Sequence, residues 1–306
     1  MSDGPRISVG IASRGRPESL ARCVASLAAI GDVVDEVIVV DDGSPEPLEP
    51  LVRRALGARE QATMRVVRFE SGDGLARARS EAVFQARSAF VLNLDDDAVV
   101  VSVDAVRLAL RTMAADPTIL AVAFAQAQAD GSAWPAGAQP APVDYPCYVA
   151  SFIGFAHLVR RDAFTALGGF RRQLMINGEE RELCLRALDA GWRIVYLPDA
   201  RIAHLADPAG RDVRRYLHLT VRNGVLSSIY NDPWPLLAVR VPTRLRAYFA
   251  MRRGWGVQDP GGFRAIVAWI RRDFREAWAQ RHAVRWSTIR EWRRLTRRFP
   301  RYRAPA

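Results

Sequence analysis

The 306-residue chain contains no lysine, only three cysteines, and no apolar stretch long enough to cross a bilayer. Cys23, Cys147 and Cys184 are odd in number and lack the spacing of metal ligands, which argues against a disulfide framework and a cysteine-based metal site. Buried small apolar side chains are the simplest interpretation of all three. With no recognisable secretory segment, this predicts a cytoplasmic protein.

Because lysine is absent, all 44 basic residues are arginine, and they are unevenly distributed. Residues 1–239 are nearly balanced, with 26 arginines against 29 acidic residues, whereas residues 240–306 hold 18 arginines against 4. The basic excess therefore belongs to the C-terminal segment, and a partner inferred from charge is a partner of that segment.

Three consecutive aspartates, Asp95-Asp96-Asp97, close the apolar run of residues 89–94. Like charges this close repel unless something positive lies among them, and a hard divalent cation, Mg²⁺ or Mn²⁺, would neutralise them. An apolar run that ends in carboxylates is typical of a buried parallel strand opening on a ligand crevice. A solvated acidic turn after a strand is the alternative for the triplet taken alone.

The first half of the chain alternates strand and helix patterns, which predicts an α/β fold with a mostly parallel sheet covered on both faces. Strands are expected at 7–12, 37–40, 64–69 and before the triplet, with helices from Pro17, at 45–56 and at 75–87. Asp41-Asp42 follows the second strand. The carboxyl ends of parallel strands share one edge, so this pair and the triplet are expected to form one site.

The second half is less regular. Residues 126–148 are rich in Ala, Pro and Gly, which predicts a long loop with a functional role. Strands are expected at 155–159 and at 193–197, the latter closed by Pro198, and helices at 182–190 and 212–230.

The C-terminal segment, residues 236–306, is predicted to be an Arg-rich amphipathic helical extension. One helical stripe there is apolar and contains Phe263, Ile266, Val267, Ile270, Phe274 and Trp278. Two compatible interpretations stay open: helices packed on the main domain with arginines facing water, or a basic element on an anionic membrane with aromatic anchors. No nucleic-acid reader motif is present, so a nucleic-acid partner is not expected.

Seven motifs occur in an order and spacing that resemble an inverting glycosyltransferase of family 2, over residues 6–230. They are ISVGIASRGRP (7–17), VVDDGS (39–44), GLARARS (74–80), FVLNLDDD (90–97), LGGF (167–170), GEERELCLR (178–186) and GWRIVYLPDARIAH (191–204). The resemblance implies a GT-A fold, Rossmann-like with helices on both faces of the sheet, over residues 1–235.

The resemblance also implies a site for a nucleotide-diphosphate sugar. Ser13 and Arg14 lie where the nucleotide would enter, and Asp42 matches the carboxylate that binds the base, consistent with an ionised group that only accepts hydrogen bonds. Asp41 would support Asp42 or contact the ribose; alternatively, the turn caps the next helix. Arg79 matches the Arg of an Ala-Arg-Asn pattern.

For the metal, Asp95 and Asp97 match the outer residues of an Asp-x-Asp motif. Asp97 would bind Mn²⁺ or Mg²⁺, Asp95 would bind the ribose or the metal, and Asp96, at the variable middle position, belongs to the donor site. His204 falls where many members carry a metal-ligand histidine, and a neutral imidazole suits Mn²⁺.

Glu179-Glu180 falls where the family carries an acidic pair, usually Glu-Asp, that supplies the base. Both residues are candidates and Glu180 is favoured. The predicted reaction moves a sugar from a UDP, dTDP or GDP donor to a glycan or lipid-linked hydroxyl acceptor, in cell-surface polysaccharide, glycolipid or secondary-metabolite synthesis. A peripheral position at the inner face of the membrane fits the basic extension.

Other classes fit less well. A haloacid-dehalogenase-like phosphatase would need Thr or Val after its second Asp and a later Lys, whereas Ala98 stands here and lysine is absent. A sugar-phosphate nucleotidyltransferase would need a glycine-rich basic signature that residues 13–17 only faintly match. A catalytically degenerate nucleotide-sugar-binding scaffold stays open, because Glu180 replaces the usual Asp and small misplacements of a base are costly.

Overall fold

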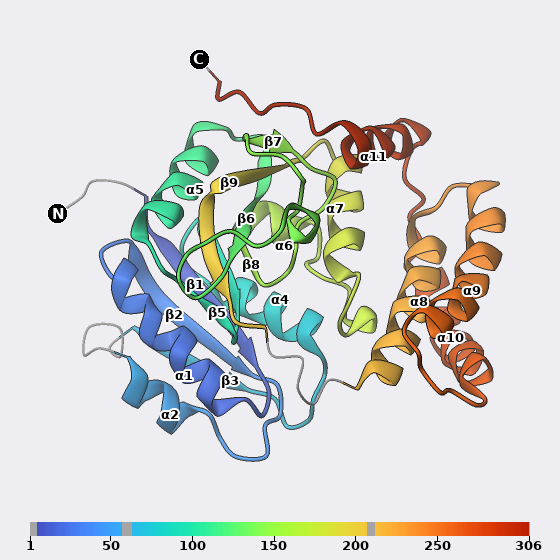
Figure 1. The fold of residues 1–306 in the computed structure, drawn as a ribbon, viewed down its shortest axis with the longest axis horizontal. Coiled ribbons are helices and arrows are strands. Elements are labelled where there is room, and N and C mark those ends of the chain that lie inside the picture. Colours follow the sequence, from blue (N-terminus) through green and yellow to red (C-terminus); the bar gives the residue numbers. More distant parts are fainter. Residues whose placement is uncertain (1–4, 57–62, 207–211, 306) are drawn as a thin grey trace.

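The structure, a computed structural model, describes residues 5–56, 63–206 and 212–305. Its centre is a nine-stranded sheet in the order β3-β2-β1-β4-β8-β6-β9-β5, with β7 paired to β9 (Figure 1). The strands are β1 (Ile7–Ser13), β2 (Val34–Asp41), β3 (Met64–Arg68), β4 (Phe90–Asp95), β5 (Ala98–Val99), β6 (Ile119–Ala127), β7 (Cys147–Tyr148), β8 (Ala156–Arg160) and β9 (Arg193–His204).

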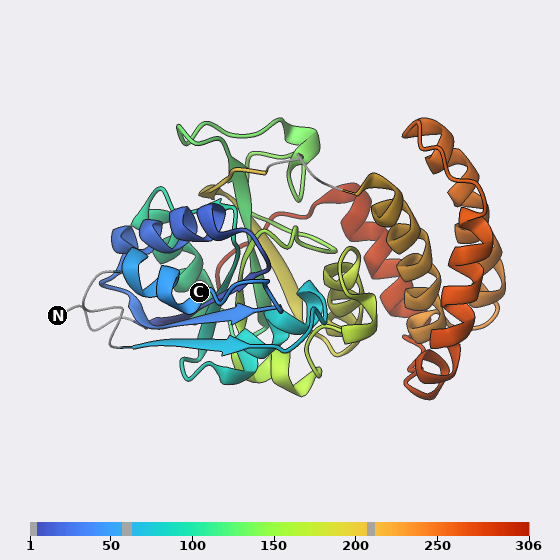
Figure 2. The same cartoon turned by 90° about the horizontal axis from the view of Figure 1, so that it is seen from below.

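Helices cover both faces of the sheet, because side chains alternate between faces along each strand. On β2, Val37 and Val39 pack into one core, and Ile38 and Val40 into the other. The first core contains α1 (Pro17–Ser26), α2 (Glu49–Ala55) and α5 (Val103–Ala115); the second contains α4 (Leu75–Gln85), α6 (Arg161–Ala166) and α7 (Glu179–Asp189) (Figures 1 and 2). The predicted α/β class is confirmed.

The carboxyl ends of three parallel strands meet at one edge. β1 lies between β2 and β4 and runs parallel to both, with Ser13 beside Asp41 and Ala12 beside Asp95. The predicted common edge is therefore confirmed. Beyond β4 the sheet becomes mixed, since β8 runs antiparallel to both β4 and β6.

Several elements differ from the sequence prediction. The strand expected to close at Pro198 continues as β9 to His204, which corrects that boundary. The register with β6 shifts between Phe124, opposite Leu197, and Ala125, opposite Arg201. Pro198 falls inside this irregularity, where no ladder hydrogen bond requires its missing N–H.

The bounds of the other elements differ less from the sequence prediction. Residues 126–148 form a long connection, but β6 takes its first two residues, β7 its last two, and a 3₁₀ turn occupies Ala136–Ala138. Helix α2 is shorter than predicted, and α7 begins at Glu179, three residues earlier than expected. Helix α5 and strand β6 were not predicted from the sequence, whereas helix α9 (Leu236–Gly254) lies within the predicted helical extension.

The C-terminal helices divide into two groups. Helix α8 (Val213–Asn231) packs against α9 and against α10 (Gly262–Ala279), and these three lie beside the sheet domain (Figure 2). Helix α11 (Trp286–Arg298) instead packs on α7 and adds Ile289, Trp292 and Leu295 to the second core. The boundary at residue 235 stays a prediction, and it falls between helices α8 and α9, which pack together.

The last described residues return to the sheet. Tyr302 donates its backbone N–H to Pro146, and Tyr148 donates to Pro300, so the chain end lies against β7. Packing of the extension on the main domain is thus confirmed for α11 and the tail. None of the helices within the described ranges is both long and apolar enough to cross a bilayer.

Candidate active site

A cleft of about 650 Å³ opens at the carboxyl edge of β1, β2 and β4. It is closed on the other side by the loop before β8, the start of α7 and the first turns of α8. Of the residues predicted from sequence, its lining contains Ser13, Arg14, Asp42, Arg79, Asp95, Asp96, Asp97, Glu179, Glu180 and His204. Asp41 is the one predicted site residue outside that lining.

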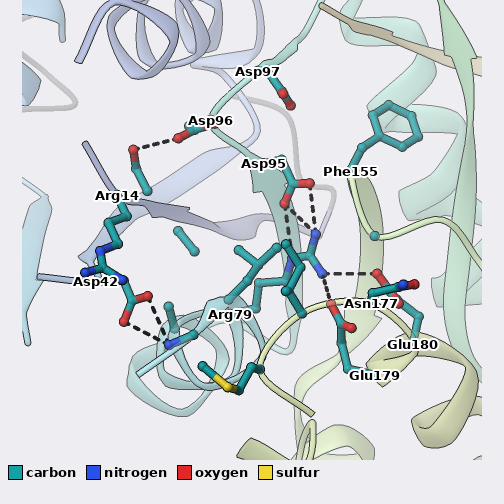
Figure 3. Close-up of a pocket in the computed structure, with 18 of the residues that line it drawn as sticks. Arg14, Asp42, Arg79, Asp95, Asp96, Asp97, Phe155, Asn177, Glu179 and Glu180 are labelled. Atoms are coloured by element: carbon teal, nitrogen blue, oxygen red, sulfur yellow. Dashed lines mark hydrogen bonds and ion pairs between the residues drawn. The ribbon is translucent and has the colours of Figure 1, made fainter. Parts of the chain in front are cut away.

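Arg79 joins three of the predicted acids (Figure 3). Its Nη2 donates to both oxygens of Asp95 at 2.6 and 2.9 Å, and its Nη1 donates to Glu179 at 2.9 Å and to Glu180 at 3.1 Å. Although burial opposes its charge, the three carboxylates raise the pKa of Arg79. A buried guanidinium thus couples the Asp-x-Asp strand to the head of α7, a link that its predicted role in donor binding did not include.

The two glutamates at the head of α7 differ in access. The side chain of Glu179 is 1% exposed and that of Glu180 is 16% exposed. Burial, reinforced by Glu180, raises the pKa of Glu179. Gly154 lies close above Arg79 and Glu180, where a Cβ would collide with both side chains. Both glutamates line the cleft, and Glu180 is the more accessible of the two.

Arg16, which the sequence analysis did not select, holds the other two aspartates. It donates to Asp96 at 2.6 Å and to Asp97 at 3.0 Å, while the Ser13 hydroxyl donates to Asp96 at 2.7 Å. Burial raises the pKa of Asp96 to about 7, against the lowering by Arg16 and Ser13. The signal for Arg16 was its place in the basic segment after β1, beside Arg14.

Asp97 and His204 have donor atoms that fit a divalent cation. Asp97 Oδ1 is buried without a hydrogen-bond partner, and it faces His204 Nε2 at 3.5 Å. Within the described ranges, no three His, Cys, Asp or Glu side chains cluster as a complete metal cage. Two protein ligands, with the remaining positions left to phosphates and water, are usual for Mg²⁺ beside nucleotides.

At the end of β2, the neighbouring aspartates have different surroundings. Asp41 is fully buried and accepts from the backbone of Ser44 at 2.8 Å and from Arg68 at 3.3 Å. Its position agrees with support of the turn rather than contact with a ligand. Asp42 lines the cleft and accepts from the backbone N–H groups of Asp73 and Gly74 at 2.7 and 3.0 Å. Burial raises the pKa of Asp42, even though these bonds and Arg14 lower it.

The residues of the far wall of the cleft were not predicted from the sequence. Arg215, Tyr216 and Leu219 line it from α8, and Asn177 and Phe152 from loops. These residues stand outside the motifs, and the packing of α8 against α7 brings those of α8 to the site.

A strand end with three aspartates thus faces an acidic helix head across one cleft, as the motifs that resemble a GT-A glycosyltransferase predict. Comparison with solved structures agrees on the fold. A mannosyltransferase from Pyrobaculum calidifontis, solved with GDP-Man and Mn²⁺, superposes with a TM-score of 0.61 at 16% identity, over 97% of this chain and 88% of that one. Residues 1–349 of S. aureus TarS with UDP give 0.55 at 17% identity, over 95% and 90%.

The chain belongs to glycosyl transferase family 2, whose model matches residues 8–168. Among curated proteins it resembles the pre-mycofactocin glycosyltransferase of Mycobacterium tuberculosis, with 32% identity over 214 residues. That match covers 65% of this chain and 42% of the relative, so the chain spans less than half of that protein. The predicted family and GT-A fold are confirmed, whereas the roles of individual site residues stay predictions.

Proposed function

We propose that this chain transfers a sugar from a nucleotide-diphosphate sugar to a hydroxyl acceptor, with inversion at the anomeric carbon. The observation that carries the proposal is the bridge of Arg79, which ties Asp95 on the donor side to Glu180 on the opposite wall of one cleft. Solved relatives of the same fold hold GDP-Man, UDP or UDP-GlcNAc, which supports a donor of this class.

The donor's diphosphate would lie near Asp97 and His204, which would hold Mn²⁺ or Mg²⁺ between them. The bound cation supplies electrophilic stabilisation of the charge that develops on the leaving diphosphate. Asp42, fixed by two backbone N–H groups, would accept a hydrogen bond from the nucleotide base. Arg14 lies beside Asp42, and its positive charge would attract the phosphates (Figure 3). Arg16 holds Asp97 Oδ2, which leaves Oδ1 for the cation.

Glu180 would act as the base. Its Oε1 accepts from Arg79, and its side chain is 16% exposed, whereas that of Glu179 is 1% exposed. As the acceptor oxygen bonds to the anomeric carbon and the bond to the diphosphate breaks, the hydroxyl proton passes to Glu180. Attack opposite the leaving group inverts the configuration.

Donor binding tests the proposal. Calorimetry against UDP-, GDP-, dTDP- and CDP-sugars, with and without Mn²⁺, is expected to select one nucleotide and to show metal-dependent affinity. Asp97→Asn is expected to remove most of that metal dependence, because the orphaned Oδ1 becomes part of a neutral amide. Proton NMR of the first product is expected to show the inverted anomer.

Three outcomes would contradict this scheme. Equal metal dependence in Asp97→Asn would overturn the metal assignment. Donor binding without turnover on any acceptor, for wild type and the Glu180→Gln variant alike, would favour a degenerate scaffold. Formation of a nucleotide sugar from a sugar phosphate would favour a nucleotidyltransferase.

We further propose that the extension binds an anionic membrane, and that the acceptor is lipid-linked. Two acids of the helical unit are buried or half-buried and paired: Asp259 with Arg214 and His218, and Asp273 with Arg222. In the part of the chain that the structure describes, five exposed arginines on α9 and α10 have no acidic partner: Arg246, Arg253, Arg264, Arg271 and Arg275. Exposed apolar side chains on the same helices, Val239, Phe249, Phe274 and Trp278, would anchor them.

Vesicle flotation tests this surface. The full chain is expected to bind vesicles with phosphatidylglycerol at low salt and to release at high salt. Changing Arg246, Arg253, Arg271 and Arg275 to Gln is expected to remove most of the binding, since each contributes about 1 kcal/mol near an anionic surface. The matched control changes four exposed arginines of the sheet domain: Arg22, Arg54, Arg87 and Arg111. Equal loss in both quadruple variants, or no binding by wild type, would refute the docking surface.

A further inference from the structure

The long connection after β6 reaches back to His204. Trp134, in that connection, stacks on the imidazole with ring centroids 5.7 Å apart and planes 19° apart. Phe155 stacks on it as well, at 4.8 Å and 19°. The ring of His204 is therefore held between two aromatic side chains, which fixes its plane but leaves open which nitrogen carries the proton.

Gln126 decides that question. Its side chain is buried between His204 and the connection: the amide Nε2 donates to the carbonyl of Ala138, so Oε1 is the atom that faces His204 Nδ1. A carbonyl oxygen only accepts, so Nδ1 must carry a proton, and the Nδ1–H form is the tautomer that this contact selects for a neutral imidazole. Gln139 accepts from the backbone of Gln126 at 2.8 Å and donates to its carbonyl at 2.9 Å, which fixes the residue in place.

A proton on Nδ1 determines what the other ring nitrogen, Nε2, can bind. With the proton on Nδ1, the lone pair of Nε2 points toward Asp97 Oδ1, 3.5 Å away, and that oxygen has no hydrogen-bond partner. Two acceptor atoms that face each other in a buried site repel unless a cation or an added proton lies between them. Hydrogen bonds to the outer nitrogen of a metal-binding histidine set its tautomer and orientation in this way.

We propose that Gln126 is a positioning residue that presents His204 Nε2 to a divalent cation shared with Asp97, with the 128–139 segment supplying the carbonyl that orients Gln126. The inference rests on the proposed metal site, and it gives the long connection predicted from sequence a specific task. Neither Gln126 nor Trp134 touches the donor in this scheme. They act on the proposed metal site only through the imidazole of His204.

Two readouts test it, of which one needs no metal. In metal-free protein labelled with ¹⁵N-histidine at pH 8, the His204 signals, identified by their loss in His204→Asn, are expected to report the Nδ1–H tautomer. Gln126→Met removes the acceptor at similar length and is expected to shift the population toward Nε2–H. The Kd for Mn²⁺, measured by electron paramagnetic resonance, is expected to rise by about 10- to 100-fold.

Gln128→Met is the matched control, because the same change is made in the same connection on an exposed side chain. It is expected to match wild type in both readouts. Gln126→Leu repeats the test if the Met variant unfolds. Unchanged tautomer in both Gln126 variants, or unchanged Mn²⁺ affinity where Asp97→Asn lowers it, would overturn the inference. If Asp97→Asn leaves Mn²⁺ binding intact, the proposed metal site fails instead, and the tautomer measurement still decides the role of Gln126.

Discussion

Glu180→Gln is expected to lower kcat by about 10²- to 10⁴-fold, the usual contribution of a general base, while donor affinity stays near the wild-type value. The amide keeps the size of the side chain and can keep the contact with Arg79 through its oxygen. It cannot take the proton of the acceptor hydroxyl. Single-turnover transfer with a saturating donor measures the loss, and calorimetry with the same donor measures the binding.

Glu179→Gln is the matched comparison, since it makes the same change one residue away on the same guanidinium. Because Glu179 is 1% exposed, it has little access to an acceptor, and a much smaller loss of kcat is expected. Glu180→Asp keeps a carboxylate and restores the residue usual in the family, so measurable transfer should persist. If Glu179→Gln proves the more damaging change, the base is Glu179 and the assignment is reversed.

The sheet and its acidic edge were predictable because each depends on a local pattern. Continuous apolar runs identify buried parallel strands, and parallel strands place Asp41, Asp42 and Asp95 at one edge whatever the rest of the chain does. The end of β9 was predicted wrongly because it does not depend on a local pattern alone. Pro198 is a local signal against a strand, and the register shift that tolerates it is a property of the pairing with β6.

The contacts that organise the site were less accessible to sequence reasoning. A motif selected Arg79 as a site residue, but nothing local predicted that it would bridge three carboxylates. Arg16 is one of 44 arginines and had no predicted role. Gln126 lies 78 residues from His204, and the pair meets only because β6 and β9 are neighbours. Motifs could therefore predict most of the residues that line the cleft, whereas the contacts that Arg79, Arg16 and Gln126 make there depend on tertiary packing.

Arg79→Met is expected to lower the free energy of unfolding by about 3–5 kcal/mol at pH 7, the usual result of removing one partner from a buried ion pair. The side chain is 3% exposed, and its loss leaves Asp95, Glu179 and Glu180 facing one another without a counter-charge. Since Glu179 already has a raised pKa, these carboxylates would be relieved by protonation. Urea unfolding of both proteins at several pH values measures the difference.

The pH dependence distinguishes lost charge from lost packing. A carboxyl group whose pKa is raised in the folded state destabilises that state above its unfolded pKa, so the deficit of Arg79→Met should grow as the pH rises above about 4 and shrink below it. A simple packing defect would give the same deficit at every pH. Arg54→Met, the same change at an exposed arginine of α2 outside the cleft lining, is the control and should show little deficit and no such slope. A deficit in Arg79→Met that is independent of pH would mean that Arg79 stabilises the cleft by its volume, and the electrostatic bridge between donor side and base would have to be abandoned.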